Sequence, residues 1–168
     1  MFQVGDMIFY PMHGAGLIEA IEEKEILGER KLYYIFNIPS KNVQIMVPVD
    51  KASEYGMRRA VSPETLDEIL AGFYSGNTDP DIYDNQRYCI SVNKTKIKSG
   101  DIYQITEIIR DLVRKSKKNK LCIEDRNMLD SARQILISEV AQVKGIDEEE
   151  AGNLLDEVIE REEKIAGL

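Results

Sequence analysis

Cationic side chains gather in the middle of this sequence, where they could bind phosphate groups. Residues 87–133 hold 12 Lys and Arg against 6 Asp and Glu, a net charge of +6, whereas residues 1–86 and 134–168 each carry −7. Cations at one end of a helical bundle would contact phosphates in a way that depends on salt and tolerates many base sequences. Alternatively, the charges are segregated only along the sequence and spread apart when the chain folds. The candidates for phosphate contact are Arg87, Lys94, Lys96, Arg110, Arg114, Lys117, Lys118 and Arg126.

Two tyrosines flank the start of this basic region. Tyr83 and Tyr88 could stack on bases or wedge between them, as aromatic side chains do in nucleic-acid-binding proteins. The alternative is that each ring packs inside a helical bundle with its hydroxyl at the surface. For Tyr88 we favour packing, and for Tyr83 both alternatives stay open.

Other residue patterns do not predict an enzyme, a metal site or a cofactor. The one histidine, His13, lies in a glycine-rich turn and has no Cys or Asp spaced to form a metal site or a triad with it. The stretch Gly14-Ala15-Gly16 lacks the third glycine and the following helix of a dinucleotide-binding fingerprint. Cys89 and Cys122 are far apart and form no C-x-x-C pair, so neither a disulfide nor a zinc site is predicted.

Length and hydropathy limit the architecture. A chain of 168 residues suits one domain or two small ones. No apolar run approaches the roughly 20 residues that a membrane span needs, and the N-terminus lacks a basic region followed by an apolar one. These features predict a cytoplasmic protein with no membrane partner. The overall net charge of −8 argues against tight nucleic-acid binding by the free protein, so any such contact should be local and weak.

The first fifty residues predict a small β module. Apolar and polar residues alternate from Phe2 to Phe9, and Gly14 and Gly16 then allow a tight reversal. Short, closely spaced strands separated by turns are typical of an SH3-like barrel. We therefore expect such a barrel over residues 1–56, with strands at residues 2–9, 17–26, 31–38 and 43–49.

After Asp50 the apolar period changes from two residues to 3.6, which predicts helices. Ser62-Pro63 can cap and start the first helix. Residues 60–168 should therefore form an all-α bundle of about five helices, which makes the whole chain an α+β protein. The expected helical segments are residues 62–73, 81–98, 101–118, 123–143 and 147 onward.

Two separated motifs resemble one known family. The first is the opening V-G-D-M-I-F-Y-P-M-H-G-A-G-L-I-E-A-I-E with the later Val47-Pro48. The second is I-I-R-D-L-V-R followed by M-L-D-S-A-R-Q-I-L-I-S-E-V-A. Their order, over nearly the whole chain, is similar to the bacterial CarD/CdnL transcription regulators. The first half is also similar to the RNA-polymerase-interacting domain of transcription-repair coupling factors.

The resemblance implies a Tudor-like β module that docks on the β subunit of RNA polymerase. A basic family position on the second strand falls on Lys24, whereas a second one, just before the Val-Pro pair, falls on Met46. Together with Ile45 and Val47, these are the expected polymerase contacts. Pairing through the backbone of the strand would not depend on the missing charge.

The resemblance also implies a helical domain that contacts promoter DNA at the upstream edge of the transcription bubble and modulates the open complex, commonly by stabilising it. Family members place a wedging tryptophan shortly before an Arg-Tyr pair. Here Arg87-Tyr88 matches the pair, but Asp84 occupies the wedge position, with Tyr83 beside it. Arg126 falls where the family has a basic DNA-contacting residue. The alternative is an adaptor that binds polymerase or another protein and no longer engages promoter DNA. The oligomeric state could be a monomer or a domain-swapped dimer.

Overall fold

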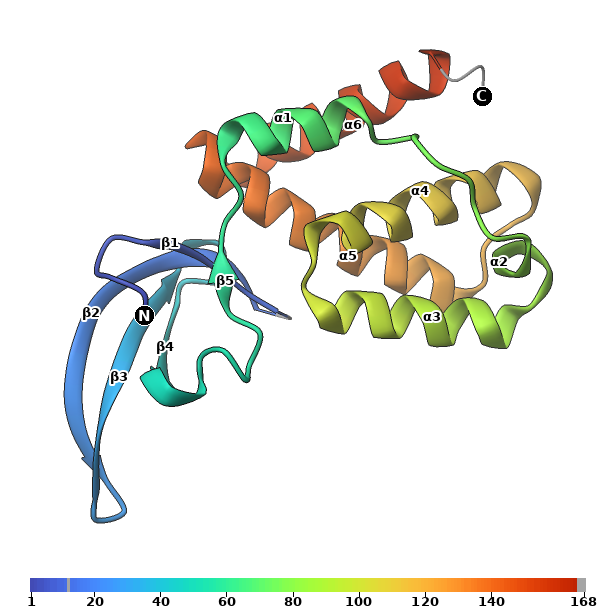
Figure 1. The fold of residues 1–168 in the computed structure, drawn as a ribbon. Helices are drawn as coiled ribbons and strands as arrows, with labels where there is room; N and C mark the ends of the chain where they lie inside the picture. The colour runs from blue at the N-terminus through green and yellow to red at the C-terminus, as the bar shows by residue number, and fades with distance from the viewer. Residues whose placement is uncertain (12, 166–168) are drawn as a thin grey trace.

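A computed structural model, which describes residues 1–11 and 13–165, shows a five-stranded β-sheet joined to a set of helices (Figure 1). Neighbouring strands are antiparallel, in the order β4-β3-β2-β1-β5. Among the described residues β4 and β5 do not pair with each other, so the expected closure into a barrel is not formed and the sheet is open. The strands are β1 (Met7–Tyr10), β2 (Gly14–Ile26), β3 (Glu29–Ile38), β4 (Val43–Pro48) and β5 (Arg58–Arg59), with 3₁₀ helices at Pro39–Lys41 and Val49–Lys51.

One face of the sheet carries the core of the β module. Alternate residues of β3, namely Tyr34, Phe36 and Ile38, are buried on this face, because side chains in a strand point to opposite sides in turn. Ile18 of β2 and Val47 of β4 lie in the same cluster. The sheet is close-packed enough that a Cβ at position 16 would overlap the carbonyl oxygen of Asn37, so this position requires glycine.

Beyond this core, β2 and β3 continue as a two-stranded hairpin that projects from the sheet (Figure 1). Its two-residue turn, Leu27-Gly28, has positive φ at both positions (53° and 81°), as a type I′ turn requires. The predicted second and third strands therefore extend well past the hydrophobic cluster.

Six α-helices follow the sheet, and one expected segment is divided in two. The sequence predicted one less regular helical segment over about residues 81–98, but α2 and α3 are separated at Asn85, whose backbone is extended. The Asn85 side chain accepts a hydrogen bond from the Tyr88 amide at 3.1 Å and so caps α3. No helix of the described residues is long and apolar enough to cross a membrane. The helices are α1 (Pro63–Ala71), α2 (Pro80–Asp84), α3 (Gln86–Ser99), α4 (Ile102–Lys118), α5 (Ile123–Lys144) and α6 (Glu148–Ile165).

Helix α5 lies against the other helices and also against the β module (Figure 1). Its residues Ala132, Leu136 and Val140 are buried in one apolar cluster that draws on all six helices. At the opposite side of α5, Ser138 Oγ accepts a hydrogen bond from the Ala15 amide of β2 at 3.0 Å. The β module and the helices therefore share a direct, hydrogen-bonded junction.

Candidate nucleic-acid interface

The ends of three helices are joined by a buried polar cluster at the end of the bundle farthest from the sheet (Figure 1). Lys115 Nζ of α4 donates to Asp125 Oδ2 of α5 at 2.7 Å and to Gln86 Oε1 of α3 at 2.7 Å. Gln86 Nε2 in turn donates to Asp125 Oδ1 at 3.1 Å. We call the surface around these helix ends, residues 80–88 and 115–126, the distal end.

Burial and charge set the protonation of this cluster. Burial acts to lower the pKa of Lys115, but its hydrogen bond to Asp125 and the nearby negative charge outweigh burial, so its pKa lies above the ordinary value. Burial, with the Asp125 carboxylate, raises the pKa of the Cys89 thiol to about 11. Both groups therefore keep their protons at neutral pH, and the cluster is an ion pair beside a neutral thiol.

Exposed cations surround this cluster at the distal end. Arg87 at the start of α3, Lys118 at the end of α4 and Arg126 at the start of α5 are all exposed. Lys118 Nζ lies 4.0 Å from the centre of the Tyr83 ring, a cation–π contact. The structure thus places four of the residues predicted to contact nucleic acid at the distal end, on four different helices.

Tyr88 does not pack inside the bundle as we favoured, because its side chain is exposed. Its hydroxyl donates to Asp79 Oδ2 at 2.8 Å and ties the start of α3 to the cap of α2. This bond and the one from the Asp81 amide hold the pKa of Asp79 below its ordinary value, with the backbone contact contributing more.

Arg110 and Arg114 are half-buried and bonded within the chain, so the structure does not place them among the exposed cations of the distal end. Arg114 donates to the carbonyl oxygens of Tyr74 (2.7 Å) and Gly76 (3.0 Å). Arg110 donates to the carbonyl oxygen of Ser75 at 2.8 Å and pairs with Asp111 at 2.9 Å. Both guanidinium groups therefore fasten the loop between α1 and α2 to α4.

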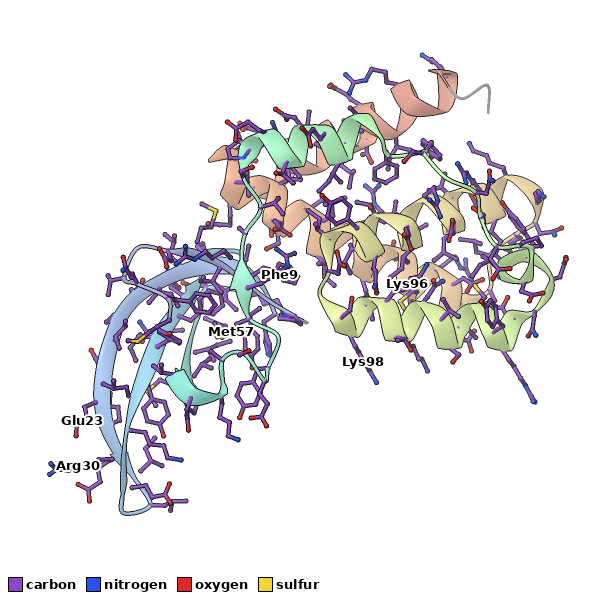
Figure 2. All side chains as sticks on the ribbon, in the orientation of Figure 1. Phe9, Glu23, Arg30, Met57, Lys96 and Lys98 are labelled. Carbon is purple, nitrogen blue, oxygen red and sulfur yellow. The ribbon has the colours of Figure 1, made fainter. Side chains whose placement is uncertain are left out.

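Lys96 and Lys94 also lie outside the distal end. Lys96 points from α3 toward α4 and pairs with Glu107 at 2.8 Å (Figure 2). Lys94 is exposed, seven residues or about 10 Å along α3 from Arg87. Lys117 is exposed near the end of α4 and remains a candidate.

Three of the four residues predicted to bind polymerase lie on β4, one of the two edges of the sheet. Val47 is 1% exposed and Ile45 packs on the same cluster, so their side chains support the strand from inside. Met46 points to the other face and is 46% exposed. The side of the β4 backbone away from β3 has no strand partner among the described residues.

Lys24 shares a face of the sheet with Met46 but lies away from it. Met46 is opposite Ile35, which is opposite Ala20, four residues before Lys24 along β2. At about 3.3 Å per residue, Lys24 and Met46 are offset by about 13 Å along the strand direction, in addition to lying two strands apart. Lys24 is therefore on the projecting hairpin, where it pairs with Glu22 at 3.0 Å.

Comparison with known proteins settles the family. Residues 2–61 match the CarD-like/TRCF RID domain, and residues 68–156 match the family described as CarD, C-terminal domain. The "Putative transcription factor YdeB" of Bacillus subtilis (strain 168) is 42% identical over 150 residues, which cover 89% of this chain and 97% of that protein. The chain belongs to the CarD-like family. This is a family of transcription regulators that interact with RNA polymerase, and its members are not enzymes.

A solved structure matches part of this CarD-like chain. The solution NMR structure of the 72-residue N-terminal domain of Myxococcus xanthus CarD is 29% identical to it and covers 35% of this chain and 79% of that one, with a TM-score of 0.31. The family assignment rests on the two domain matches and on the Bacillus protein.

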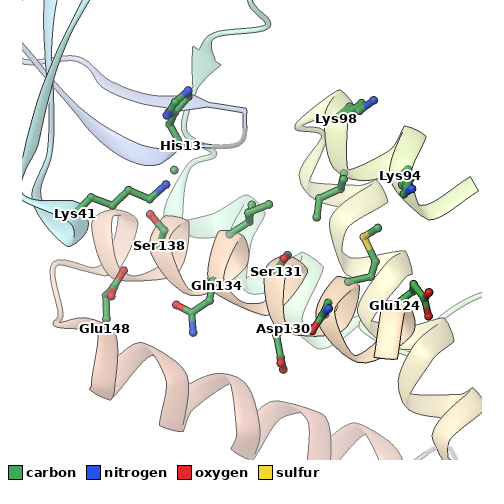
Figure 3. A pocket seen from close by; sticks show the side chains of 15 residues that line it. His13, Lys41, Lys94, Lys98, Glu124, Asp130, Ser131, Gln134, Ser138 and Glu148 are labelled. Atoms are coloured by element: carbon green, nitrogen blue, oxygen red, sulfur yellow. The ribbon is translucent and has the colours of Figure 1, made fainter. Parts of the chain in front are cut away.

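Sequence reasoning missed a groove of about 840 Å³ between the β module and the helices of this CarD-like protein (Figure 3). His13 and Lys41 line it from the β module, and Lys94 and Lys98 line it from α3. The spacing of Lys94 and Lys98, four residues apart on one helix, would have placed them on a common face. Nothing in the sequence showed that the turn holding His13 comes to lie opposite them.

Proposed function

We propose that this CarD-like protein binds the β subunit of RNA polymerase through the free edge of β4 and contacts promoter DNA with the distal end. The contact lies at the upstream edge of the transcription bubble and stabilises the open complex. The observation that carries the proposal is the exposure of Arg87, Lys118 and Arg126 at the distal end, with Lys118 over the Tyr83 ring, at the opposite end of the molecule from β4 (Figure 1).

Tethering explains how an acidic protein could act on DNA. Exposed backbone groups of β4 can pair with a strand of the polymerase, and Met46 adds an apolar side chain at the same edge. Once bound, the distal end meets promoter DNA at a high effective concentration, so a few phosphate contacts suffice. The net charge of −8 then limits binding to DNA away from polymerase.

The distal end favours phosphate contact over a base wedge. Lys118 covers the Tyr83 ring, and Asp84 next to it places an exposed carboxylate where the family has tryptophan. A carboxylate repels phosphates, so the stabilisation of the bubble should be weaker than with a tryptophan wedge. The same two features favour the second candidate function, an adaptor that binds polymerase without engaging DNA.

A charge-reversal experiment separates these two functions. The variant Lys118→Glu/Arg126→Glu alters the distal end but leaves β4 unchanged, and Lys51→Glu/Lys144→Glu makes the same change in net charge elsewhere. Open-complex lifetime and polymerase affinity are measured for each. We expect the distal variant to lose the effect on lifetime while it keeps wild-type affinity, and the control to keep both. An unchanged lifetime effect in the distal variant would support the adaptor instead.

A further inference from the structure

Helix α3 carries cations and no carboxylates. Its fourteen residues include Arg87, Lys94, Lys96 and Lys98 and no Asp or Glu. Positions 94 and 98 follow position 87 by seven and eleven residues, close to two and three helical turns. The three side chains therefore lie on one face of the helix. All three are exposed, and none has an ion-pair partner among the described side chains, whereas Lys96 on another face is paired. The exposed face of α3 is therefore a line of available positive charge about 16 Å long.

This line of charge runs from the distal end to the groove beside the β module. Lys98, near the end of α3, points away from the helices into solvent, and Lys94 and Lys98 both line the groove (Figures 2 and 3). On the other side of the groove, Lys41 extends toward His13 and Ser138 (Figure 3). The ammonium of Lys41 and the imidazole of His13 thus lie across the groove from the end of the cationic line on α3.

We propose that the DNA backbone continues from the distal end along α3 into this groove, where Lys41 and His13 of the β module contact its phosphates. The inference rests on the proposed DNA contact and extends it to the module that also holds polymerase. B-DNA carries one phosphate per 3.4 Å of axis on each strand, so the line of about 16 Å on α3 matches the axial rise of roughly five base pairs. The β module would then fix both the polymerase and the upstream DNA.

The rest of the groove is compatible with a backbone that follows its cationic side. Helix α5 forms the floor with Asn127, Ser131 and Gln134, uncharged side chains that can donate hydrogen bonds to phosphate oxygens. Carboxylates line the α5 and α6 side, where they repel a phosphate and keep it near α3 and the β module. These carboxylates are Glu124, Asp130 and Glu148.

His13 offers a direct reporter because it is the only histidine in the chain. Its ring stacks on Tyr10, with 4.5 Å between ring centres. Burial and the ammonium of Lys41 hold the pKa of His13 below its ordinary value. The other charged groups that line the groove are Lys94 and Lys98 on one side and Glu148, Asp130 and Glu124 on the other. A phosphate bound between His13 and Lys41 would favour the imidazolium and raise this pKa.

The test uses the full chain on polymerase–promoter complexes. The groove variant Lys41→Gln/Lys98→Gln is compared with Lys51→Gln/Lys144→Gln, which removes one lysine from each module outside the groove. We measure how the effect on open-complex lifetime falls with salt. Loss of two phosphate contacts should reduce the slope of the logarithm of this effect against log salt by about 2. When salt rises fourfold, the fall in the effect should therefore be about tenfold smaller for the variant than for the wild type. The control pair should keep the wild-type slope.

NMR of His13 tests the groove directly, with a 20-base-pair duplex and with tripolyphosphate at equal phosphate concentration. We expect the duplex to raise the pKa of His13 and tripolyphosphate to leave it unchanged. An equal response to tripolyphosphate would mean a site for small phosphate compounds and would overturn the inference, as would a wild-type slope in the groove variant. If Lys118→Glu/Arg126→Glu loses its effect while the groove variant behaves as wild type, the proposed function stands and only this extension fails.

Discussion

Arg58 and Glu139 form a two-pronged ion pair that joins the β module to the helices. Nη1 of Arg58 lies 2.8 Å from Oε1 of Glu139, and Nη2 lies 2.9 Å from Oε2. The same guanidinium donates twice to the carbonyl oxygen of Gly100 and lies over the Phe9 ring, 4.4 Å from its centre. One side chain of β5 therefore holds α5, the end of α3 and β1 together, which fixes the direction in which the distal end points from the sheet.

We expect Arg58→Ala to destabilise the protein by about 3 kcal/mol. The Glu139 side chain is 1% exposed, so removal of Arg58 leaves a buried carboxylate without its charge partner. Urea unfolding measures the change. The neighbouring Arg59→Ala is a matched control, because its pair with Asp6 at 3.3 Å is exposed and should contribute less than about 1 kcal/mol. Equal losses in the two variants would contradict the role of Arg58.

The stability of the helical domain should fall as the pH rises from 9 to 11. The Cys89 thiol has a pKa of about 11 in the folded chain and an ordinary value of 9.0, so the unfolded chain loses this proton first. The stabilisation is complete below pH 9 and is lost as the pH rises through 11, a total effect of about 3 kcal/mol. The raised pKa of Lys115 acts in the same direction.

Urea unfolding of the wild type and of Cys89→Ala at pH 8, 9, 10 and 11 tests this dependence. The variant lacks the thiol, so its stability should fall less between pH 9 and 11, even if it starts lower because of the lost side chain. Parallel curves for the two proteins would show that the thiol does not carry the effect.

Arg114→Ala should free the loop between α1 and α2 without altering DNA contact. The substitution removes the hydrogen bonds from Arg114 to the carbonyl oxygens of Tyr74 and Gly76, and these carbonyls then bind water. The free energy of unfolding should fall by about 1 to 3 kcal/mol. Hydrogen exchange and limited proteolysis at residues 72–79 would detect the release. Lys117→Ala, on the same helix, is the control and should leave the loop protected.

Met46→Arg should strengthen binding to RNA polymerase. The substitution restores a cation at a position where the resemblance implies a basic contact, on an edge strand where the side chain is exposed. One exposed ion pair contributes up to about 1 kcal/mol, or about fivefold in affinity. Met46→Leu keeps the side chain apolar and should bind as the wild type does. A titration of purified polymerase that shows no gain for the arginine would contradict the proposed edge.

Asp84→Trp should lengthen the life of the open complex. It replaces a carboxylate that repels phosphate with an aromatic ring that can stack on a base, an interaction of about 1 to 3 kcal/mol. Asp81→Trp, on the same short helix but three residues earlier, controls for the added aromatic surface. Lifetimes that rise equally in both variants would show that the position of the ring is unimportant.

Much of the fold could be predicted because it follows from local patterns. Ser62-Pro63 starts α1, and the apolar stripes of α4 and α5 ended within a residue or two of the helices observed. Alternation in β3 identified the strand that carries the core. The break at Asn85 was missed, because a capping asparagine inside a helical pattern looks the same as an exposed polar residue until its backbone is seen.

The sequence by itself determined the family, the two kinds of secondary structure and the excess of positive charge in the middle of the chain. Only the tertiary structure decided what each cation does. Arg114 and Lys118 are four residues apart on one helix, yet the first binds loop carbonyls and the second covers Tyr83. Arg58 and Glu139 meet although 81 positions separate them. Charge is a property of composition, whereas a partner for a charge depends on which distant segments the packed core brings within about 4 Å.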